Sequence, residues 1–194
     1  WGSWNEYSGG QTTGLGSHHV DIAQWAMGME HSGPISEDGR GRLPNVANGY
    51  NVPIDYAATL VYPDGTVMEV RDTGRGGIMF EGDKGRFFVN RGTLAGKPVE
   101  QLRDDPLPES DSQLYDHDDL NRAGRTASDE FELAGNYPPI ANHVGNFFDC
   151  VKKKNTPISE VDSQHRSVSI CHLVNISIRV GRKLNMSLIH ISGP

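Results

Sequence analysis

The strongest constraint on the fold of this chain is the presence of two predicted hairpins. In each, two segments of alternating apolar and polar residues are joined by a short turn. DYAATLVY and TVMEVRD flank Pro63, Asp64 and Gly65, an arrangement typical of a β-hairpin. GGIMFE and RFFVNRG flank residues 82–85 in the same way and predict a second hairpin. Residues 33–43 can begin a further strand. We therefore expect at least four strands in a mostly antiparallel sheet with one face packed on a core.

The clearest early helix signal covers residues 18–28, where apolar residues recur at helical spacing. Ser17 is the expected N-cap, because its hydroxyl can accept a hydrogen bond from a first-turn amide. Asp21 is expected in the first turn, where the helix dipole favours a carboxylate. Gly28 is the expected residue just after the helix end.

Two later segments predict secondary structure, one of them clearly and the other ambiguously. PPIANHVGNFFDCVKKKN opens with two prolines, contains an apolar stripe and ends in lysines, which predicts a helix. SVSICHLVNISIRV alternates strictly between apolar and polar residues. By period alone this alternation favours a strand, because a helical stripe through Val161, Val168, Cys171 and Val174 is weaker.

Composition excludes several classes of protein. The 194 residues include 23 glycines and 11 prolines, which favours a turn-rich fold with much sheet. A net charge of −7 argues against binding the phosphate backbone of nucleic acids. The longest apolar run is far short of the ~20 residues that cross a bilayer, and two cysteines imply no disulfide framework. The acidic stretch 100–119 is interpreted as a solvated loop.

Paired histidines beside a glycine-rich turn are the main candidates for chemistry. His18 and Asp21 are three residues apart and share a helix face, whereas His19 points elsewhere. The pair could transfer a proton near neutral pH, or bind a metal together with the distant Asp116, His117, Asp118 and Asp119. It could also be an ordinary helix N-terminus. Likewise Trp1, Trp4 and Tyr7 could form an aromatic wall for a sugar ring or simply pack.

Four segments in order resemble one protein family. They are YSGGQTTGLGSHHVDIAQWAMG, SGPISEDGRG, GGIMFEGDKGRFFVNRG and NHVGNFFDCVKKKNTPISEVDSQHRSVSICHLVNISIRVGRKL. Together they resemble the C-terminal domain of the Gfo/Idh/MocA oxidoreductases, relatives of glucose–fructose oxidoreductase and inositol dehydrogenase, in the bacterial-type branch. The resemblance runs from about Trp1 to Leu184 and implies a domain over 1–184, followed by an atypical tail over 185–194.

The resemblance implies a two-domain enzyme of which this chain is one half. In the family, an N-terminal Rossmann domain binds NAD(P). The C-terminal domain is α/β, of the two-layer α+β kind, with a large, mostly antiparallel open sheet and helices on one face. No G-x-G-x-x-G follows a strand here, so we expect no cofactor-binding residue in this chain, and the family's catalytic lysine has no counterpart. The resemblance also implies a helix around 160–183, against the alternation, and we adopt the helix.

The resemblance further implies site residues. His18 matches the family's catalytic histidine, and Tyr7, Gly10, His19 and Asp21 are the expected substrate-binding residues. The family places an aspartate four positions before that histidine, where this chain has Gly14. Glycine cannot orient an imidazole or bind a substrate hydroxyl, so the usual carboxylate partner is absent.

The resulting hypothesis is the substrate-binding and oligomerisation domain of an NAD(P)-dependent sugar or polyol oxidoreductase, inactive alone because the cofactor domain is absent. The expected partners are a sugar or polyol and a second copy of the chain across the sheet face, with no nucleic acid and no membrane, and the expected location is the cytoplasm. One alternative is a degenerate stand-alone sugar-binding or assembly module. Another is a small metal-dependent isomerase or hydrolase that uses His18, His19 and Asp21.

Overall fold

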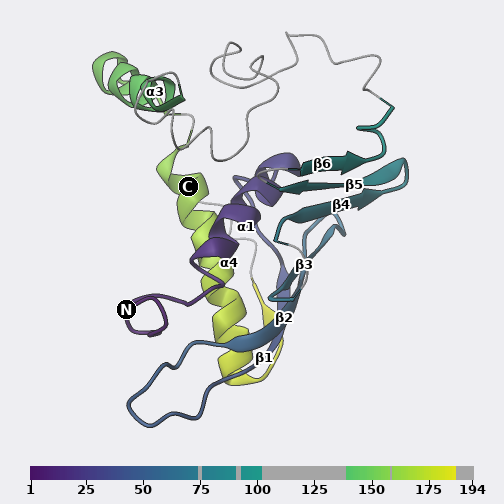
Figure 1. The fold of residues 1–194 in the computed structure, drawn as a ribbon, viewed down its shortest axis with the longest axis vertical. Coiled ribbons are helices and arrows are strands. Elements are labelled where there is room, and N and C mark those ends of the chain that lie inside the picture. The colour runs from purple at the N-terminus through teal and green to yellow at the C-terminus, as the bar shows by residue number, and fades with distance from the viewer. Residues whose placement is uncertain (74–75, 91–92, 102–138, 158, 187–194) are drawn as a thin grey trace. The chain divides into compact units, whose positions relative to one another are not determined.

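A computed structural model describes residues 1–73, 76–90, 93–101, 139–157 and 159–186 (Figure 1). The chain divides into two compact units. Unit 1 comprises Trp1–Arg75 and Ser159–Pro194, and unit 2 comprises Gly76–Ile158. The predicted tail 185–194 lies outside the described residues from position 187 onward, as does most of the acidic stretch.

Unit 1 contains a four-stranded antiparallel sheet in the order β3-β2-β1-β7. Its strands are β1 (Ser36–Arg42), β2 (Ile54–Val61), β3 (Val67–Arg71) and β7 (Leu184–Asn185). The first predicted hairpin is confirmed, because Val61 pairs with Val67 across the turn. The turn is set locally: the Asp64 carboxylate accepts a hydrogen bond from the Thr66 amide at 2.9 Å, and Gly65 takes a φ of +88° that favours glycine.

Two helices complete unit 1. Helix α4 (Val161–Val180) packs against β1, and α1 (Leu15–Ala26) packs against α4; both lie on the same side of the sheet (Figure 1). A glycine allows the close approach, since a Cβ at Gly39 would lie 3.0 Å from the Val174 carbonyl oxygen. The core consists of apolar side chains from both helices and from the strands, namely Val20, Ala23, Tyr56, Ala58, Leu60, Tyr62, Met68, Ile170, Cys171, Val174 and Ile178.

Residues 161–180 form a helix, so the strand favoured by their alternation is wrong and the helix implied by the family resemblance is confirmed. The Glu160 side chain caps the first turn by accepting from the Ser163 amide at 3.1 Å. Gly181 ends the helix in the left-handed region, with a φ of +66°. Isoleucine and valine lie both on the buried face, as Ile170 and Val174 do, and on the exposed face, as Ile176 does. Because branched apolar residues lie on both faces of the helix, the sequence alternates between apolar and polar residues as a strand does.

One acidic side chain lies inside this core. Glu37 of β1, opposite Leu60 of β2, is fully buried. Neither of its carboxylate oxygens finds a hydrogen-bond partner among the described residues. Burial raises the pKa of Glu37 to about 8. The side chain is therefore mostly protonated at neutral pH, because a neutral carboxyl costs less to bury than a charged one.

Unit 2 contains a three-stranded antiparallel sheet and one described helix. The strands are β4 (Ile78–Gly82), β5 (Gly85–Asn90) and β6 (Thr93–Gly96), in that order across the sheet, and the helix is α3 (Pro139–Lys153). The second predicted hairpin is confirmed by the pairing of Gly82 with Gly85. The aromatic rings of Phe80 and Phe87 stack with their centroids 5.0 Å apart.

The predicted fold class is confirmed: helices combine with antiparallel sheets, and the strands are divided between sheets of four and three. In the part of the chain that the structure describes, no helix has both the length and the apolar character needed to cross a bilayer.

Candidate functional site

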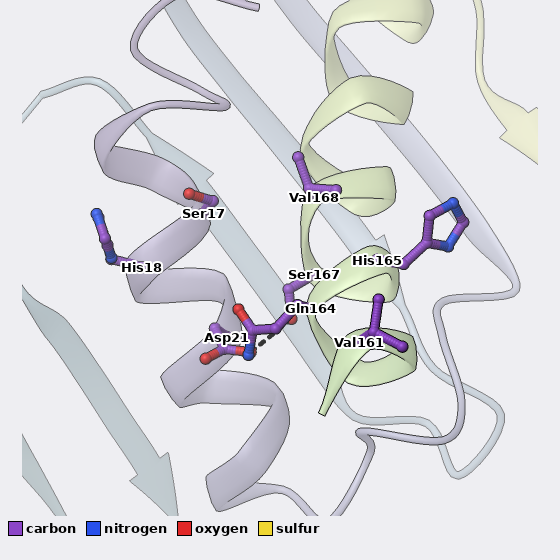
Figure 2. A pocket seen from close by; sticks show the side chains of 8 residues that line it. All are labelled: Ser17, His18, Asp21, Val161, Gln164, His165, Ser167 and Val168. Carbon is purple, nitrogen blue, oxygen red and sulfur yellow. Dashed lines mark hydrogen bonds between the residues drawn. The ribbon is translucent and has the colours of Figure 1, made fainter. Parts of the chain in front are cut away.

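A pocket of about 400 Å³ lies between α1 and α4 in unit 1 (Figure 2). The two helices are far apart in the sequence, and α4 contributes more of the lining than α1. The lining residues are Ser17, His18, Asp21, Val161, Gln164, His165, Ser167 and Val168. The pocket therefore brings the predicted pair, His18 and Asp21, together with side chains that no local sequence signal had indicated.

Asp21 is fixed by α4. Its Oδ1 accepts one hydrogen bond from Gln164 Nε2 at 3.0 Å and another from the Ser167 hydroxyl at 2.9 Å (Figure 2). Ser167 is buried, so its hydroxyl has little access to water as a competing partner. The second carboxylate oxygen makes no hydrogen bond to the described residues and is free to accept one from a ligand.

His18 is exposed and lies one helical turn from Asp21. In Figure 2 its ring lies on the side of α1 away from α4, whereas Asp21 lies between the two helices. Neither an ion pair nor a hydrogen bond to the described residues holds the imidazole. The imidazole is therefore exposed at the edge of the pocket and accessible to a molecule that approaches α1 from this side.

Helix α1 begins earlier than the sequence predicted. Its N-cap is Gly14, which offers no side-chain acceptor, and Ser17 lies inside the first turn, where its hydroxyl donates to the Gly14 carbonyl at 2.8 Å. The prediction of Ser17 as N-cap is therefore wrong. Asp21 is correspondingly in the second turn, so the helix dipole is not what places a carboxylate there. Gly28, with a φ of +66°, follows the helix as predicted.

The glycine-rich segment before α1 is held by packing and by α4. The Asn175 side-chain amide donates to the Gly9 carbonyl at 2.8 Å, and the Gly9 amide donates to the Thr13 hydroxyl at 2.8 Å. Gly10 has a φ of +74°, and a Cβ there would lie 2.7 Å from Val52. At Gly9 a Cβ would lie 2.2 Å from the Thr13 side chain, so neighbouring side chains leave no room for a side chain at either position.

The other predicted site residues lie outside the pocket lining. Tyr7 is 74% exposed, Gly10 faces Val52, and His19 is half-buried. The ring of Trp4 packs edge-on against Tyr50 at a centroid distance of 6.5 Å. Their roles in substrate binding stay predictions.

A metal site has no support in the described ranges, which contain no group of three or more His, Cys, Asp or Glu side chains placed to hold an ion. The acidic residues that would complete such a site, Asp116, Asp118 and Asp119 with His117, lie outside the described residues.

Sequence reasoning missed the α4 side of the pocket. Gln164, His165 and Ser167 are more than 140 positions from Asp21, and each is an ordinary polar residue of a helix. Only the packing of α4 on α1 places them at the site.

No protein-family model matches the chain, and no curated protein is significantly similar to it in sequence. Its fold is similar to solved structures of two dehydrogenases and an NAD-binding protein. The WlbA dehydrogenase from Bordetella pertussis, in complex with NADH and UDP-GlcNAcA, matches 89% of this chain with a TM-score of 0.56 and 18% identity. An NAD-binding protein from Listeria innocua matches 95% with a TM-score of 0.58 and 14% identity.

A third similar structure is a putative myo-inositol dehydrogenase from Sinorhizobium meliloti, which matches 92% of this chain with a TM-score of 0.53 and 13% identity. The chain spans only about half of each of these proteins: 46% of the first and 50% of the other two. The likeness is therefore one of fold, over a part of each protein.

Proposed function

We propose that this chain is the substrate-binding domain of an NAD(P)-dependent sugar or polyol oxidoreductase of the Gfo/Idh/MocA family. The observation that carries the proposal is the coincidence of two features. The fold matches about half the length of two solved dehydrogenases. The pocket in this half is lined by the histidine and the carboxylate that the family resemblance indicates, His18 and Asp21.

The pocket residues suit a polyhydroxylated ligand. Asp21 retains one free carboxylate oxygen, and Ser17 and Gln164 add a hydroxyl and an amide at the same pocket. Such groups bind hydroxyls, because each can donate or accept a hydrogen bond. Oxidation of an alcohol releases a proton, and the role we assign to His18 is to accept it.

The dinucleotide does not fit this chain. No glycine-rich strand-to-helix turn of the kind that holds a pyrophosphate is present in the sequence. The hydride acceptor therefore belongs to another domain or chain, and the role of this chain is to hold the substrate and to move a proton at His18. On its own it is expected to be inactive, since hydride transfer requires both reactants in one site.

The proposal is tested first by fluorescence titration of NADH into the 194-residue chain, where we expect no saturable binding. A second titration follows backbone amide NMR signals as myo-inositol or UDP-GlcNAcA is added. Shifts should concentrate at Ser17, Asp21 and Gln164 and should weaken in Asp21→Asn. Asp162→Asn, on the same helix pair but outside the pocket lining, is the matched control. Tight NADH binding, or sugar-induced shifts unaffected by Asp21→Asn, would contradict the proposal.

Gly14 supports a second candidate function, a sugar-binding or assembly module without catalysis. At this position the family has the aspartate that partners its histidine, and here the helix N-cap carries no side chain at all. The two candidates are separated by adding a cofactor-binding domain in trans or by fusion. Reduction of NAD(P) with a sugar supports the enzyme, whereas sugar binding without turnover supports the module.

The proposed partners are a sugar or polyol and a second copy of this chain that contacts the sheet face. The cytoplasm is the proposed location.

A further inference from the structure

The pocket between α1 and α4 carries one acidic side chain, and no lysine or arginine, among the described residues that line it. That acid is Asp21. Both hydrogen bonds that its Oδ1 accepts come from neutral groups, the Gln164 amide at 3.0 Å and the Ser167 hydroxyl at 2.9 Å. The described residues therefore supply no basic partner that would compensate the charge of this carboxylate.

An uncompensated carboxylate distinguishes between ligand groups by their charge. Asp21 is half-buried, and its Oδ2 accepts no hydrogen bond from the described residues. A hydrogen bond from an ammonium ion to a carboxylate is roughly twice as strong as one between neutral groups, so an amine bound here gains more than a hydroxyl does. A carboxylate or phosphate on the ligand is instead repelled by the like charge.

Apolar side chains in the same pocket strengthen this selection. Val161 and Val168 line the pocket from α4 (Figure 2), and Val168 is half-buried. Apolar walls lower the local dielectric constant and so reduce the screening of charge by water. The attraction between Asp21 and a cationic ligand group is therefore stronger in this pocket than on an open surface.

A competing preference comes from the amino end of α4, which borders the pocket, because the positive end of a helix dipole attracts anions. In this chain two acidic side chains already occupy that end. The Glu160 carboxylate accepts from the Ser163 amide at 3.1 Å, and Asp162 lies in the first turn. Arg166, the arginine nearest in sequence, is not among the lining residues. The acids therefore offset the helix dipole, and the preference for a cation stands.

We propose that the substrate held by this pocket is a sugar or polyol that carries an amino group, with its ammonium ion bound to the free carboxylate oxygen of Asp21. Gln164 Oε1 and the Ser17 hydroxyl, both at the same pocket, accept hydrogen bonds from the ligand hydroxyls. The net charge of −7 favours the approach of a cationic ligand, and it disfavours sugar acids. The inference rests on the proposed function, because it names the substrate class of the same site.

Three sugars that differ only at the terminal carbon test the inference. They are glucose, 6-amino-6-deoxyglucose and glucuronate, which carry a hydroxyl, an ammonium ion and a carboxylate there. Each is titrated into the chain at about pH 7.5, where an alkyl amine is protonated and a sugar acid is ionised, and backbone amide NMR signals are followed. We expect the amino sugar to bind at least about threefold more tightly than glucose, and glucuronate to bind more weakly than glucose.

Two variants assign the preference to Asp21. Asp21→Asn removes the charge but keeps an oxygen that can accept from Gln164 and Ser167, so the helices stay joined while the preference for the amino sugar should disappear. Asp162→Asn removes the same charge outside the pocket lining and should change the preference by less than about twofold. In the unaltered chain, about 500 mM salt should weaken binding of the amino sugar and leave binding of glucose unchanged.

The outcomes separate this inference from the proposed function. Equal affinities for glucose and the amino sugar, or a preference that survives Asp21→Asn or high salt, would overturn the inference and leave the proposed function standing. Failure of all three sugars to bind would overturn both.

Discussion

The two compact units differ in how much of their apolar surface is buried. Among the described residues, every fully buried apolar side chain belongs to unit 1. The aromatic residues of the three-stranded sheet in unit 2, Phe80, Phe87 and Phe88, are only half-buried. Burial of apolar surface is the main stabilising contribution to a fold, so the core of unit 1 is what keeps the pocket between α1 and α4 in shape.

The largest expected effect compares one leucine from each unit. Leu60 is fully buried in β2 of unit 1, whereas Leu94 in β6 of unit 2 is 57% exposed. Leu60→Ala should lower the free energy of unfolding by about 3 kcal/mol because it removes apolar contacts and leaves a cavity. Leu94→Ala should cost less than about 1 kcal/mol. Urea unfolding followed by circular dichroism measures both changes in the free energy of unfolding. Equal losses for the two variants would contradict the expectation that apolar burial stabilises unit 1 more than unit 2.

The next effect concerns the acid inside the core of unit 1. In the unfolded chain Glu37 titrates near its ordinary pKa of 4.5, and in the fold near 8. Between these values the folded chain keeps a proton that the unfolded chain has released, so stability falls as pH rises from 4.5 to 8. The expected loss over this window is several kcal/mol.

Glu37→Gln should abolish that loss, because an amide does not titrate. Denaturant midpoints recorded at intervals from pH 4.5 to 8.5 measure the slope. Glu69→Gln, on the exposed face of the same sheet, is the control and should leave the slope unchanged. A slope that persists in Glu37→Gln would mean that another group carries it.

A smaller effect is expected where the pocket itself joins the two helices. Asp21→Ala removes two hydrogen bonds to α4 and should cost about 1–2 kcal/mol. The double variant with Ser167→Ala should cost less than the sum of the two single changes, because both remove the same bond. Asp149→Ala in unit 2 breaks only the exposed pair with Lys153 and should cost at most about 0.5 kcal/mol. Additive losses would show that Asp21 and Ser167 act independently.

The smallest effect is expected at the start of α1. The φ of Gly14 is −75°, which any residue can adopt, although a Cβ there would lie 3.1 Å from the Gly10 carbonyl oxygen. Gly14→Asp supplies the missing N-cap acceptor, whereas Gly14→Ala adds the same Cβ without one. The aspartate variant should be the more stable by about 0.5–1 kcal/mol. Thermal unfolding of the pair measures the difference, and an alanine variant of equal stability would show that no cap forms.

Features with local causes were predictable from the sequence. Both hairpins were, because their turns are specified by adjacent residues, such as the Asp64 carboxylate that accepts from the Thr66 amide. The start of α1 could not be predicted from the sequence. Gly14 and Gly16 are poor helix residues, and the first turn forms despite them. The alternation of apolar and polar residues in α4 favoured a strand, which is wrong. The alternation arises because branched apolar residues lie on both the buried and the exposed faces of the helix.

Half of the candidate site could be predicted and half could not. His18 and Asp21 were indicated by their spacing on one helix. Gln164 and Ser167 were not, because their role depends on the contact of α4 with α1. Burial of Glu37 was equally hidden, since a carboxylate in a polar stretch such as SEDGRGR indicates an exposed residue.

The hydrogen bond from Asn175 to Gly9 has a consequence for maturation of the chain. Asn175, Ile176 and Ser177 form a glycosylation acceptor sequence, and the amide nitrogen that would carry the glycan is the one that donates to the Gly9 carbonyl. Asn175 is 2% exposed, so a glycan and the native contact exclude each other. Once α4 has docked, the fold therefore closes this acceptor sequence to any glycosylating enzyme.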